Sequence, residues 1–150
     1  MLQFATQRKI LSTGEYVPDW IVTCELRKRG EASGVRLDLK IDTQSDRVVV
    51  GLDYARTLRL DVGEIRRTAP RVRIRTASSG HFHAYLHDVE ILLEDNLGAW
   101  AHWKATVAFA DPDTKFCYVG KAGFLQFLRF ADNGPTFTLS PVPGFPGRHS

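Results

Sequence analysis

The sequence predicts an all-β domain, mainly antiparallel, with one or two short helices. Apolar and polar residues alternate with a period of two in several stretches, a pattern typical of strands that bury one face. Polar segments that contain glycine separate these stretches and suit turns. At 150 residues the chain has the common size of one domain. We therefore expect a single domain over residues 1–150, with its core over about 16–141 and an irregular tail over 142–150.

The clearest alternation runs from Val35 to Asp42, where the odd positions are apolar and the even positions are charged. This pattern predicts a strand with one face in the core. The segment before it predicts a second strand, because four apolar residues share one face: Trp20, Val22, Cys24 and Leu26. Residues 29–34 are mostly polar and include glycine, so they predict a hairpin connection between the two strands.

The middle of the chain predicts a short helix followed by a hairpin. Asp53 is placed to cap a helix over 54–58, because an aspartate side chain accepts hydrogen bonds from the first free backbone N–H groups. Strands are expected over 72–76 and 84–93. The small residues 77–80 between them predict a mobile hairpin tip.

The last third of the chain predicts three more strands. Residues 103–109 alternate, and Pro112 ends that strand because proline lacks a backbone donor. A short apolar strand is expected over 116–119, and a final strand over 136–139. Residues 120–127 predict a turn that leads into a helical segment.

Composition argues against several classes of partner. A net charge of +3 is mild and predicts no nucleic-acid partner. The longest uncharged apolar runs are only a few residues, whereas a membrane span needs about twenty, so no membrane association is expected. The N-terminus lacks a basic segment followed by a long apolar stretch, which predicts a cytoplasmic location. In that compartment Cys24 and Cys117 are expected to remain free thiols.

Three arginines alternate with apolar residues at and within the strand expected near 72–76: Arg71, Arg73 and Arg75. Side chains two residues apart lie on the same face of a strand. We interpret this face as solvated. A patch for an acidic partner is the alternative that stays open.

Two sequence motifs stand before and after the helix and the hairpin that are expected in the middle of the chain. An alternating strand runs into Ile41-Asp42-Thr43, and Tyr118-Val119-Gly120-Lys121 is followed by Gly123-Phe124-Leu125. Their order resembles the retropepsin-like aspartic peptidases, particularly bacterial single-domain members. In that family a strand feeds an Asp-Thr-Gly triplet, and a later Leu-Leu-Gly-Arg-like segment leads into a helix. The resemblance spans about residues 16–141 and implies a retropepsin-like closed β domain.

The resemblance implies an aspartic endopeptidase that acts as a homodimer on a peptide or protein substrate. Such hydrolysis needs two carboxyl groups, one acting as a base toward water and one as an acid toward the substrate carbonyl. A twofold dimer would supply the second Asp42. By the same resemblance Asp42 and Thr43 are the catalytic residues. Substrate-binding residues are expected in the loop and at the hairpin tip, or flap: Gln44, Ser78, Ser79 and Gly80.

Gln44 departs from the family pattern, which has glycine at this position. Glycine lets the backbone approach the substrate and the partner loop without an intervening Cβ. The alternative is therefore a catalytically inactive retropepsin-like module for dimerisation or peptide binding. Under that interpretation Asp42 is a turn residue that hydrogen-bonds the following backbone.

Three histidines offer the strongest different chemistry. His81, His83 and His87 occupy positions i, i+2 and i+6 of an expected strand, so they share one face, and neutral imidazoles bind zinc. No cysteine or carboxylate completes a well-spaced ligand set. We therefore expect neither a metal nor another cofactor.

Overall fold

A computed structural model describes residues 1–76, 80–111 and 117–150 of the chain as thirteen strands and two short helices. The strands are β1 (Leu2–Ala5), β2 (Gln7–Ile10), β3 (Tyr16–Asp19), β4 (Ile21–Arg27), β5 (Val35–Ile41), β6 (Val49–Gly51), β7 (Arg71–Thr76), β8 (Gly80–Glu94), β9 (Trp100–Asp111), β10 (Tyr118–Val119), β11 (Leu128–Asp132), β12 (Thr136–Pro141) and β13 (Arg148–His149). The helices are α1 (Asp53–Thr57) and α2 (Val62–Thr68). The prediction of an all-β fold with one or two short helices is confirmed.

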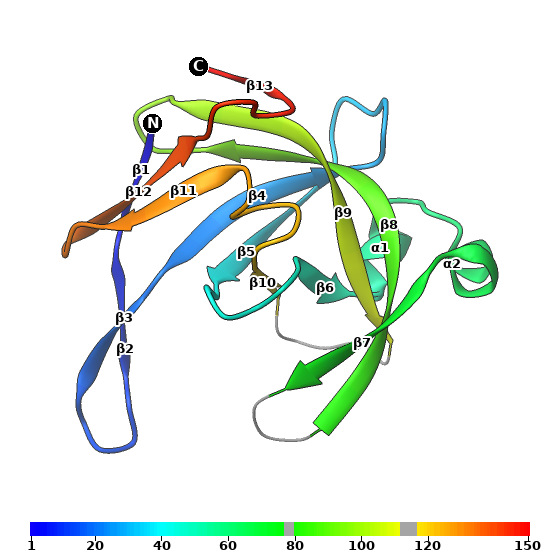
Figure 1. Ribbon diagram of the computed structural model, residues 1–150, viewed down its shortest axis with the longest axis horizontal. Helices are drawn as coiled ribbons and strands as arrows, with labels where there is room; N and C mark the ends of the chain where they lie inside the picture. The colour runs from blue at the N-terminus through cyan, green and yellow to red at the C-terminus, as the bar shows by residue number, and fades with distance from the viewer. Residues whose placement is uncertain (77–79, 112–116) are drawn as a thin grey trace.

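Six strands of the largest sheet close into a barrel (Figure 1). The sheet runs in the order β13-β9-β6-β10-β5-β4-β8-β7, and an additional pairing of β8 with β9 closes the ring. Two pairs are parallel, β5 with β10 and β6 with β9, and the others in this sheet are antiparallel. β7 lies outside the ring and forms one edge of the sheet.

β4 and β5 form the antiparallel pair expected from the alternation. Val22 lies opposite Leu39 and Cys24 lies opposite Leu37. All four side chains are buried, with at most 6% of their surface exposed. The charged positions of β5 face solvent: Arg36, Asp38 and Lys40. The alternation therefore gave the correct buried face of both strands.

Trp103 on β9 packs at the centre of the main core. Its ring makes edge contacts with Phe124 and Phe145, with centroids 5.5 and 5.6 Å away. Its indole Nε1 donates a hydrogen bond of 2.8 Å to the carbonyl of Gly123. A buried indole needs such an acceptor. This contact joins the barrel wall to the segment that follows β10.

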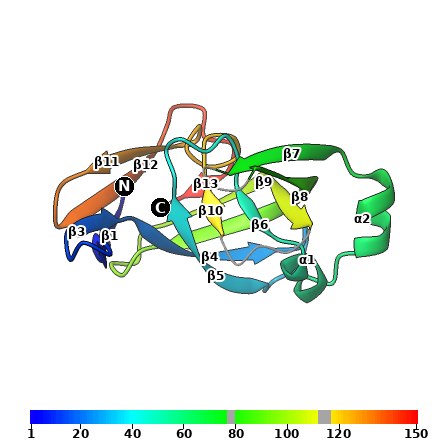
Figure 2. The same cartoon turned by 90° about the horizontal axis from the view of Figure 1, so that it is seen from below.

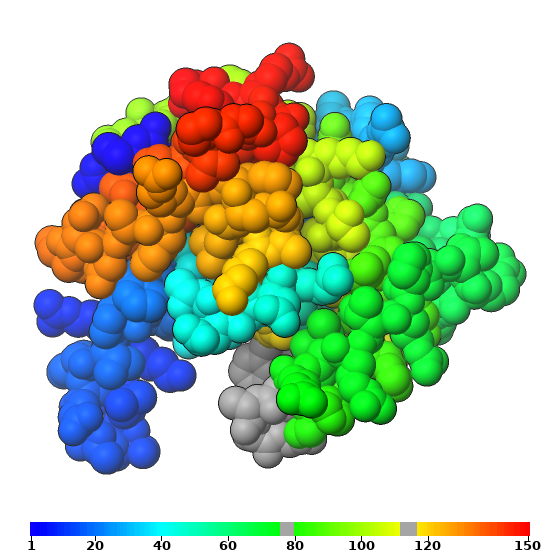
Figure 3. Space-filling model, viewed as in Figure 1, coloured from blue at the N-terminus to red at the C-terminus, as the bar shows by residue number. Residues whose placement is uncertain are grey.

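The ordered structure extends beyond the expected core limits of 16–141. β1 pairs with β12 in a three-stranded sheet with β11, and Leu2 on β1 lies in the main core with 1% exposure. β2 and β3 pair only with each other and form an arm that projects from the body (Figures 1 and 3). The tail is also less irregular than expected, because β13 pairs with β9.

Both helices differ from the sequence expectation. Leu52, with φ −61° and ψ −24°, holds the cap position of α1. Asp53 is therefore the first helical residue, and it forms an ion pair with Arg56 instead of capping the helix. α2 lies outside the expected elements, and its cap is Asp61, whose side chain accepts a hydrogen bond from the Glu64 N–H. Neither helix described here is long or apolar enough to cross a membrane.

The helical segment expected over 120–127 is a series of turns. Gly123 adopts φ +87°, a left-handed value that interrupts a right-handed helix. Its N–H donates to the Gln126 side-chain oxygen at 2.6 Å, and its carbonyl accepts the Trp103 indole. These two contacts satisfy the backbone of Gly123 without a helix.

The two cysteines are free thiols, as the sequence predicted. Cys24 is fully buried in the core, and burial raises the pKa of its thiol. Cys117 is half-buried beside the start of β10, where burial also raises its pKa. Both thiols are therefore protonated near neutral pH.

Candidate functional site

Asp42 lies directly after β5, at one end of the barrel. The Ile41 N–H donates to the Trp20 carbonyl at 2.8 Å, and the Asp42 N–H donates to the Val119 carbonyl at 2.9 Å. The strand thus stays paired on both sides up to the residue at which the chain turns. Asp42 itself is half-buried. Its position is set by two neighbouring strands.

The chain after Asp42 forms a tight turn. The Ser45 N–H donates to the Asp42 carbonyl at 3.1 Å, and the Gln44 N–H donates to the Asp42 Oδ1 at 3.0 Å. The second contact is an Asx turn, in which an aspartate side chain stabilises the backbone two residues on. Thr43 and Gln44 are exposed at the surface of this turn. The Oδ1 atom of Asp42 therefore stabilises the turn.

The C-terminal motif lies against this turn. β10 pairs in parallel with β5, with Tyr118 beside Lys40 and Val119 beside Ile41. The backbone of Lys121 then donates to the Ser45 carbonyl at 3.0 Å. The two segments singled out in the sequence are thus neighbours in space, although they are separated by more than seventy residues.

Gly120 is required at this junction. A Cβ on Gly120 would lie 2.3 Å from the Ser45 carbonyl oxygen and 2.8 Å from the Arg47 carbonyl oxygen. Both distances are shorter than Cβ atoms tolerate, and both neighbours are backbone atoms. The close approach explains why glycine follows Val119.

A cleft of about 410 Å³ opens beside Asp42. β7 and β8 form the expected antiparallel hairpin, in register from Arg71 opposite Tyr85 to Thr76 opposite Gly80. Seen from below, β7 lies on the same side of the barrel as the loop after β5 (Figure 2). The cleft is lined by residues of that loop, of β7 and of β10: Asp42, Gln44, Ser45, Asp46, Arg47, Arg73, Ile74, Arg75 and Tyr118.

The structure brings together some of the residues predicted for the site. Asp42 and Gln44 line the cleft, whereas Thr43 is exposed next to it. Gly80, with φ +94°, begins β8 at the hairpin end and is not among the lining residues. Ser78 and Ser79 lie outside the described residues.

Sequence reasoning did not place Arg73, Arg75 or Tyr118 in this site. The arginine alternation was the signal for the first two, but only the fold shows that β7 borders the Asp42 cleft. Burial raises the pKa of the Tyr118 hydroxyl, a hydrogen bond with Ser45 lowers it, and the charge of Asp42 raises it further. Tyr118 therefore stays a neutral phenol beside the Asp42 carboxylate.

Gln44 fits its position without backbone strain. Among the described non-glycine residues, Arg59 is the one with positive φ, so Gln44 holds a conformation open to any residue. Its side chain is exposed in the single chain. The turn therefore does not require the glycine that the resembled family has here.

The histidines of β8 do not converge. His81, His83 and His87 lie along one extended strand, so the first and last are about 20 Å apart at 3.3 Å per residue. Within the described ranges, no group of three His, Cys, Asp or Glu side chains is placed to hold a metal ion. His83 lies opposite Arg73 across the hairpin, and His81 lies opposite Arg75.

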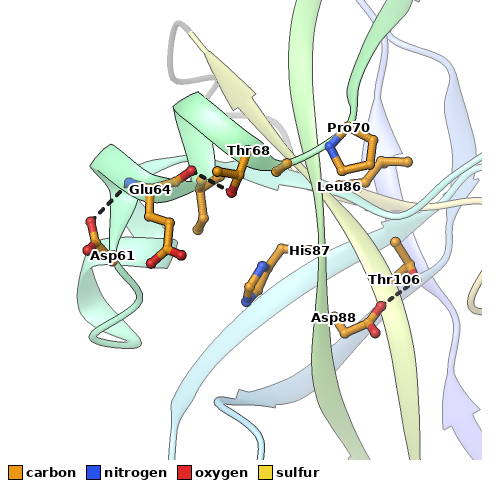
Figure 4. Close-up of a pocket in the computed structure, with 10 residues that line it drawn as sticks. Asp61, Glu64, Thr68, Pro70, Leu86, His87, Asp88 and Thr106 are labelled. Atoms are coloured by element: carbon orange, nitrogen blue, oxygen red, sulfur yellow. Dashed lines mark hydrogen bonds between the residues drawn. The ribbon is translucent and has the colours of Figure 1, made fainter.

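A cavity of about 550 Å³ lies away from Asp42, between α2 and the β8–β9 wall (Figure 4). Two of its three carboxylates, those of Asp61 and Asp88, have partners in the structure. Asp61 caps α2, and Asp88 accepts a hydrogen bond of 2.6 Å from Thr106 and lies 3.3 Å from the Lys104 ammonium. These contacts give Asp61 and Asp88 a structural role.

The fold is similar to that of a solved protein, described as a retropepsin-like aspartic protease from Rickettsia conorii. The two align with a TM-score of 0.53 and 12% sequence identity, over 93% of this chain and 96% of that chain. No protein-family model and no curated protein sequence matches the chain. At this identity the likeness concerns the fold, and it confirms the retropepsin-like all-β fold that the motifs implied.

Proposed function

We propose that the chain is an aspartic endopeptidase domain, in which two Asp42 carboxyl groups of a homodimer activate a water molecule. One observation carries the proposal. In a retropepsin-like fold, β5 delivers Asp42 into a cleft that is bordered by the β7–β8 hairpin and backed by β10. The exposed turn after Asp42 leaves room for a second chain.

The chemistry follows from two like charges held close together. Two carboxyl groups about 3 Å apart share one proton, because both cannot ionise. The charged Asp42 takes a proton from water, and the resulting hydroxide attacks the peptide carbonyl carbon. The neutral Asp42 gives its proton to the carbonyl oxygen. The Asp42 that took the water proton then gives it to the amide nitrogen, and a hydroxyl of the tetrahedral diol gives its proton to the other Asp42. The C–N bond breaks into a carboxylic acid and an amine, and the pair again holds one proton.

Neighbouring groups support this arrangement. The exposed Thr43 hydroxyl is free to contact the equivalent loop of a partner, and the β7–β8 hairpin borders the cleft in which an extended peptide would lie. These roles belong to the proposal together with Asp42.

A second candidate function is a peptide-binding or dimerisation module without catalysis. It is favoured by Gln44, which stands where the resembled family has glycine, and by the Asx turn that uses Asp42 Oδ1. In this case peptide adds beside the hairpin as a further strand but is not cut.

Substitution of Asp42 separates the two candidates. Purified protein is incubated with a diverse peptide mixture from about pH 4 to 7, and new termini are identified by mass spectrometry. Asp42→Asn should lower cleavage by about 100-fold or more, because an amide can neither act as the base nor share the proton. Asp38→Asn, on the solvent face of the same strand, is the matched control and should cleave normally.

Gln44→Gly tests the departure from the family pattern. Should the Gln44 side chain crowd the peptide or the partner loop, the glycine variant will cleave faster, and the gain will vanish in the double variant with Asp42→Asn. Equal rates in the natural protein and Gln44→Gly mean that the loop accommodates glutamine. Folded, dimeric protein that cleaves nothing in either form points to the binding module.

A further inference from the structure

Three arginines border the Asp42 cleft: Arg47, Arg73 and Arg75. Arg47 follows the Asp42 turn and is half-buried, whereas the two arginines of β7 are exposed. They come from segments that are distant in the sequence and meet only in the fold. The fold thus brings three arginines to the border of one cleft, and each carries a guanidinium group.

These guanidinium groups have no acidic partner among the residues that the structure describes. Some arginines elsewhere in the chain form ion pairs with carboxylates. Arg66 pairs with Asp111 at 3.1 Å, and Arg27 pairs with Glu25 at 3.1 Å. Two carboxylates, Asp42 and Asp46, also line the cleft, yet neither lies within ion-pair distance of an arginine. The cleft therefore offers unused donors of the type that binds carboxylates in a bidentate way.

We infer that this cleft selects acidic peptides: the arginines form a subsite for glutamate or aspartate side chains of an extended substrate. The inference rests on the proposed function, since it assumes that peptide occupies the Asp42 cleft. In the proposed dimer the two Asp42 carboxyl groups share one proton and so carry one negative charge in total. The arginines of the subsite carry more positive charge than this.

The spacing of the arginines specifies where the acidic residues should fall. Arg73 and Arg75 are two residues apart on β7, and among the strands that the structure describes β7 has no neighbour on its outer side. A peptide alongside it in extended form repeats its own side-chain direction every two residues. The subsite should thus favour two acidic residues separated by one other residue.

Arg71 provides a matched control within the same strand. It is exposed and alternates with Arg73, but it is not among the residues that line the cleft. A specific subsite therefore depends on Arg73 and Arg75 but not on Arg71, whereas a general attraction between charges depends on all three.

The test uses two fluorescent peptides that differ only in having Glu or Gln at alternate positions. Binding to Asp42→Asn protein is measured by anisotropy, so that cleavage does not interfere. The Glu peptide should bind about tenfold more tightly than the Gln peptide, in line with charge-assisted contacts. Arg73→Gln and Arg75→Gln should each reduce this preference, and Arg71→Gln should retain it.

A charge reversal guards against loss of folding. Arg75→Glu should lose the Glu peptide and gain affinity for a peptide with Lys at the same positions, which a misfolded protein cannot do. Equal affinity for Glu and Gln peptides overturns the inference, as does an Arg71→Gln effect equal to that of Arg75→Gln. It is also overturned if a short oligonucleotide displaces the Glu peptide more effectively than unlabelled Glu peptide does.

The two proposals fail in different ways. Acidic preference in binding, with no cleavage of the same peptide by the natural protein, supports the subsite and removes the peptidase mechanism. Cleavage of Glu and Gln peptides at equal rates overturns the subsite and keeps the mechanism.

Discussion

Asp95 is a buried carboxylate that joins the N-terminal strand to the β8–β9 turn. Its Oδ2 accepts the Gln3 N–H at 2.9 Å, and its Oδ1 accepts the Leu97 and Ala99 N–H groups at 2.9 Å each. The residue is 7% exposed. Burial opposes the charged form, but the backbone hydrogen bonds outweigh it and lower the pKa of Asp95. The charged form of Asp95 is therefore favoured more in the folded chain than in the unfolded chain.

We predict that Asp95→Asn lowers the free energy of unfolding near pH 7 by about 1–2 kcal/mol, because the amide has one neutral acceptor oxygen in place of two charged ones and leaves a backbone N–H without its partner. A pKa below its unfolded value of about 3.9 adds stability above that pH, and this stability is lost as the pH falls through the folded pKa. Urea unfolding should thus show that the free energy of unfolding falls less steeply with decreasing pH in Asp95→Asn than in the natural protein. Glu15→Gln, at an exposed turn, is the control. Identical acid profiles for natural and Asp95→Asn protein contradict the prediction.

Among single residues, the sequence predicts the position of Asp42 at the end of a strand, but it predicts only part of the surroundings of Asp42. Asp42 follows an alternating strand, which is a local pattern. Arg73 and Arg75 line the cleft because of where the fold places β7, and no local sequence pattern predicts that placement. Asp53 failed as a cap because Leu52 is already helical, a backbone property that residue type does not reveal.

Among the elements, alternation identified the longer strands of the barrel, but it predicted neither all of their partners nor five other strands: β1, β2, β3, β11 and β13. β4, β5 and the β7–β8 hairpin follow from periodicity and turn residues. β10 is only two residues long, too short to show a period, and no sequence pattern predicted its parallel pairing with β5. The helix expected after it was wrong because Gly123 adopts a left-handed conformation.

Gly120→Ala tests the junction between β10 and the Asp42 turn. The added Cβ would meet the Ser45 carbonyl oxygen at 2.3 Å, so the turn or β10 must shift, at a cost of about 2–3 kcal/mol. Gly63→Ala is the matched control, since its Cβ would meet only Asp61 Oδ1 at 3.4 Å and alanine favours a helix. Thermal unfolding should show a lower midpoint for Gly120→Ala and an unchanged or higher one for Gly63→Ala. The same midpoint for Gly120→Ala and the natural protein means that the junction is looser than its geometry indicates.

At the scale of the whole molecule, the barrel presents the Asp42 turn between two projecting hairpins. The β2–β3 arm lies on one side of residues 42–47 and the β7–β8 hairpin on the other (Figure 3). The proposed mechanism draws one aspartate, Asp42, from each chain. A site with two carboxyl groups therefore needs a second copy of the chain.

This requirement predicts a dimer whose twofold axis passes beside Thr43. Two Asp42 carboxyl groups about 3 Å apart bring the adjacent Thr43 residues close to each other. A disulfide forms only where two Cα atoms lie within about 7 Å, so Thr43→Cys should give a covalent dimer on mild oxidation. Cys117→Ser serves as background, because Cys117 is half-buried and Cys24 is fully buried. Leu97 is 80% exposed in the β8–β9 turn, so Leu97→Cys is the control and should remain monomeric on a non-reducing gel.

Sedimentation of the natural protein at high micromolar concentration, with and without peptide, gives an independent measurement of the dimer. Monomer under all of these conditions, with Thr43→Cys no more reactive than Leu97→Cys, removes the shared-carboxylate mechanism.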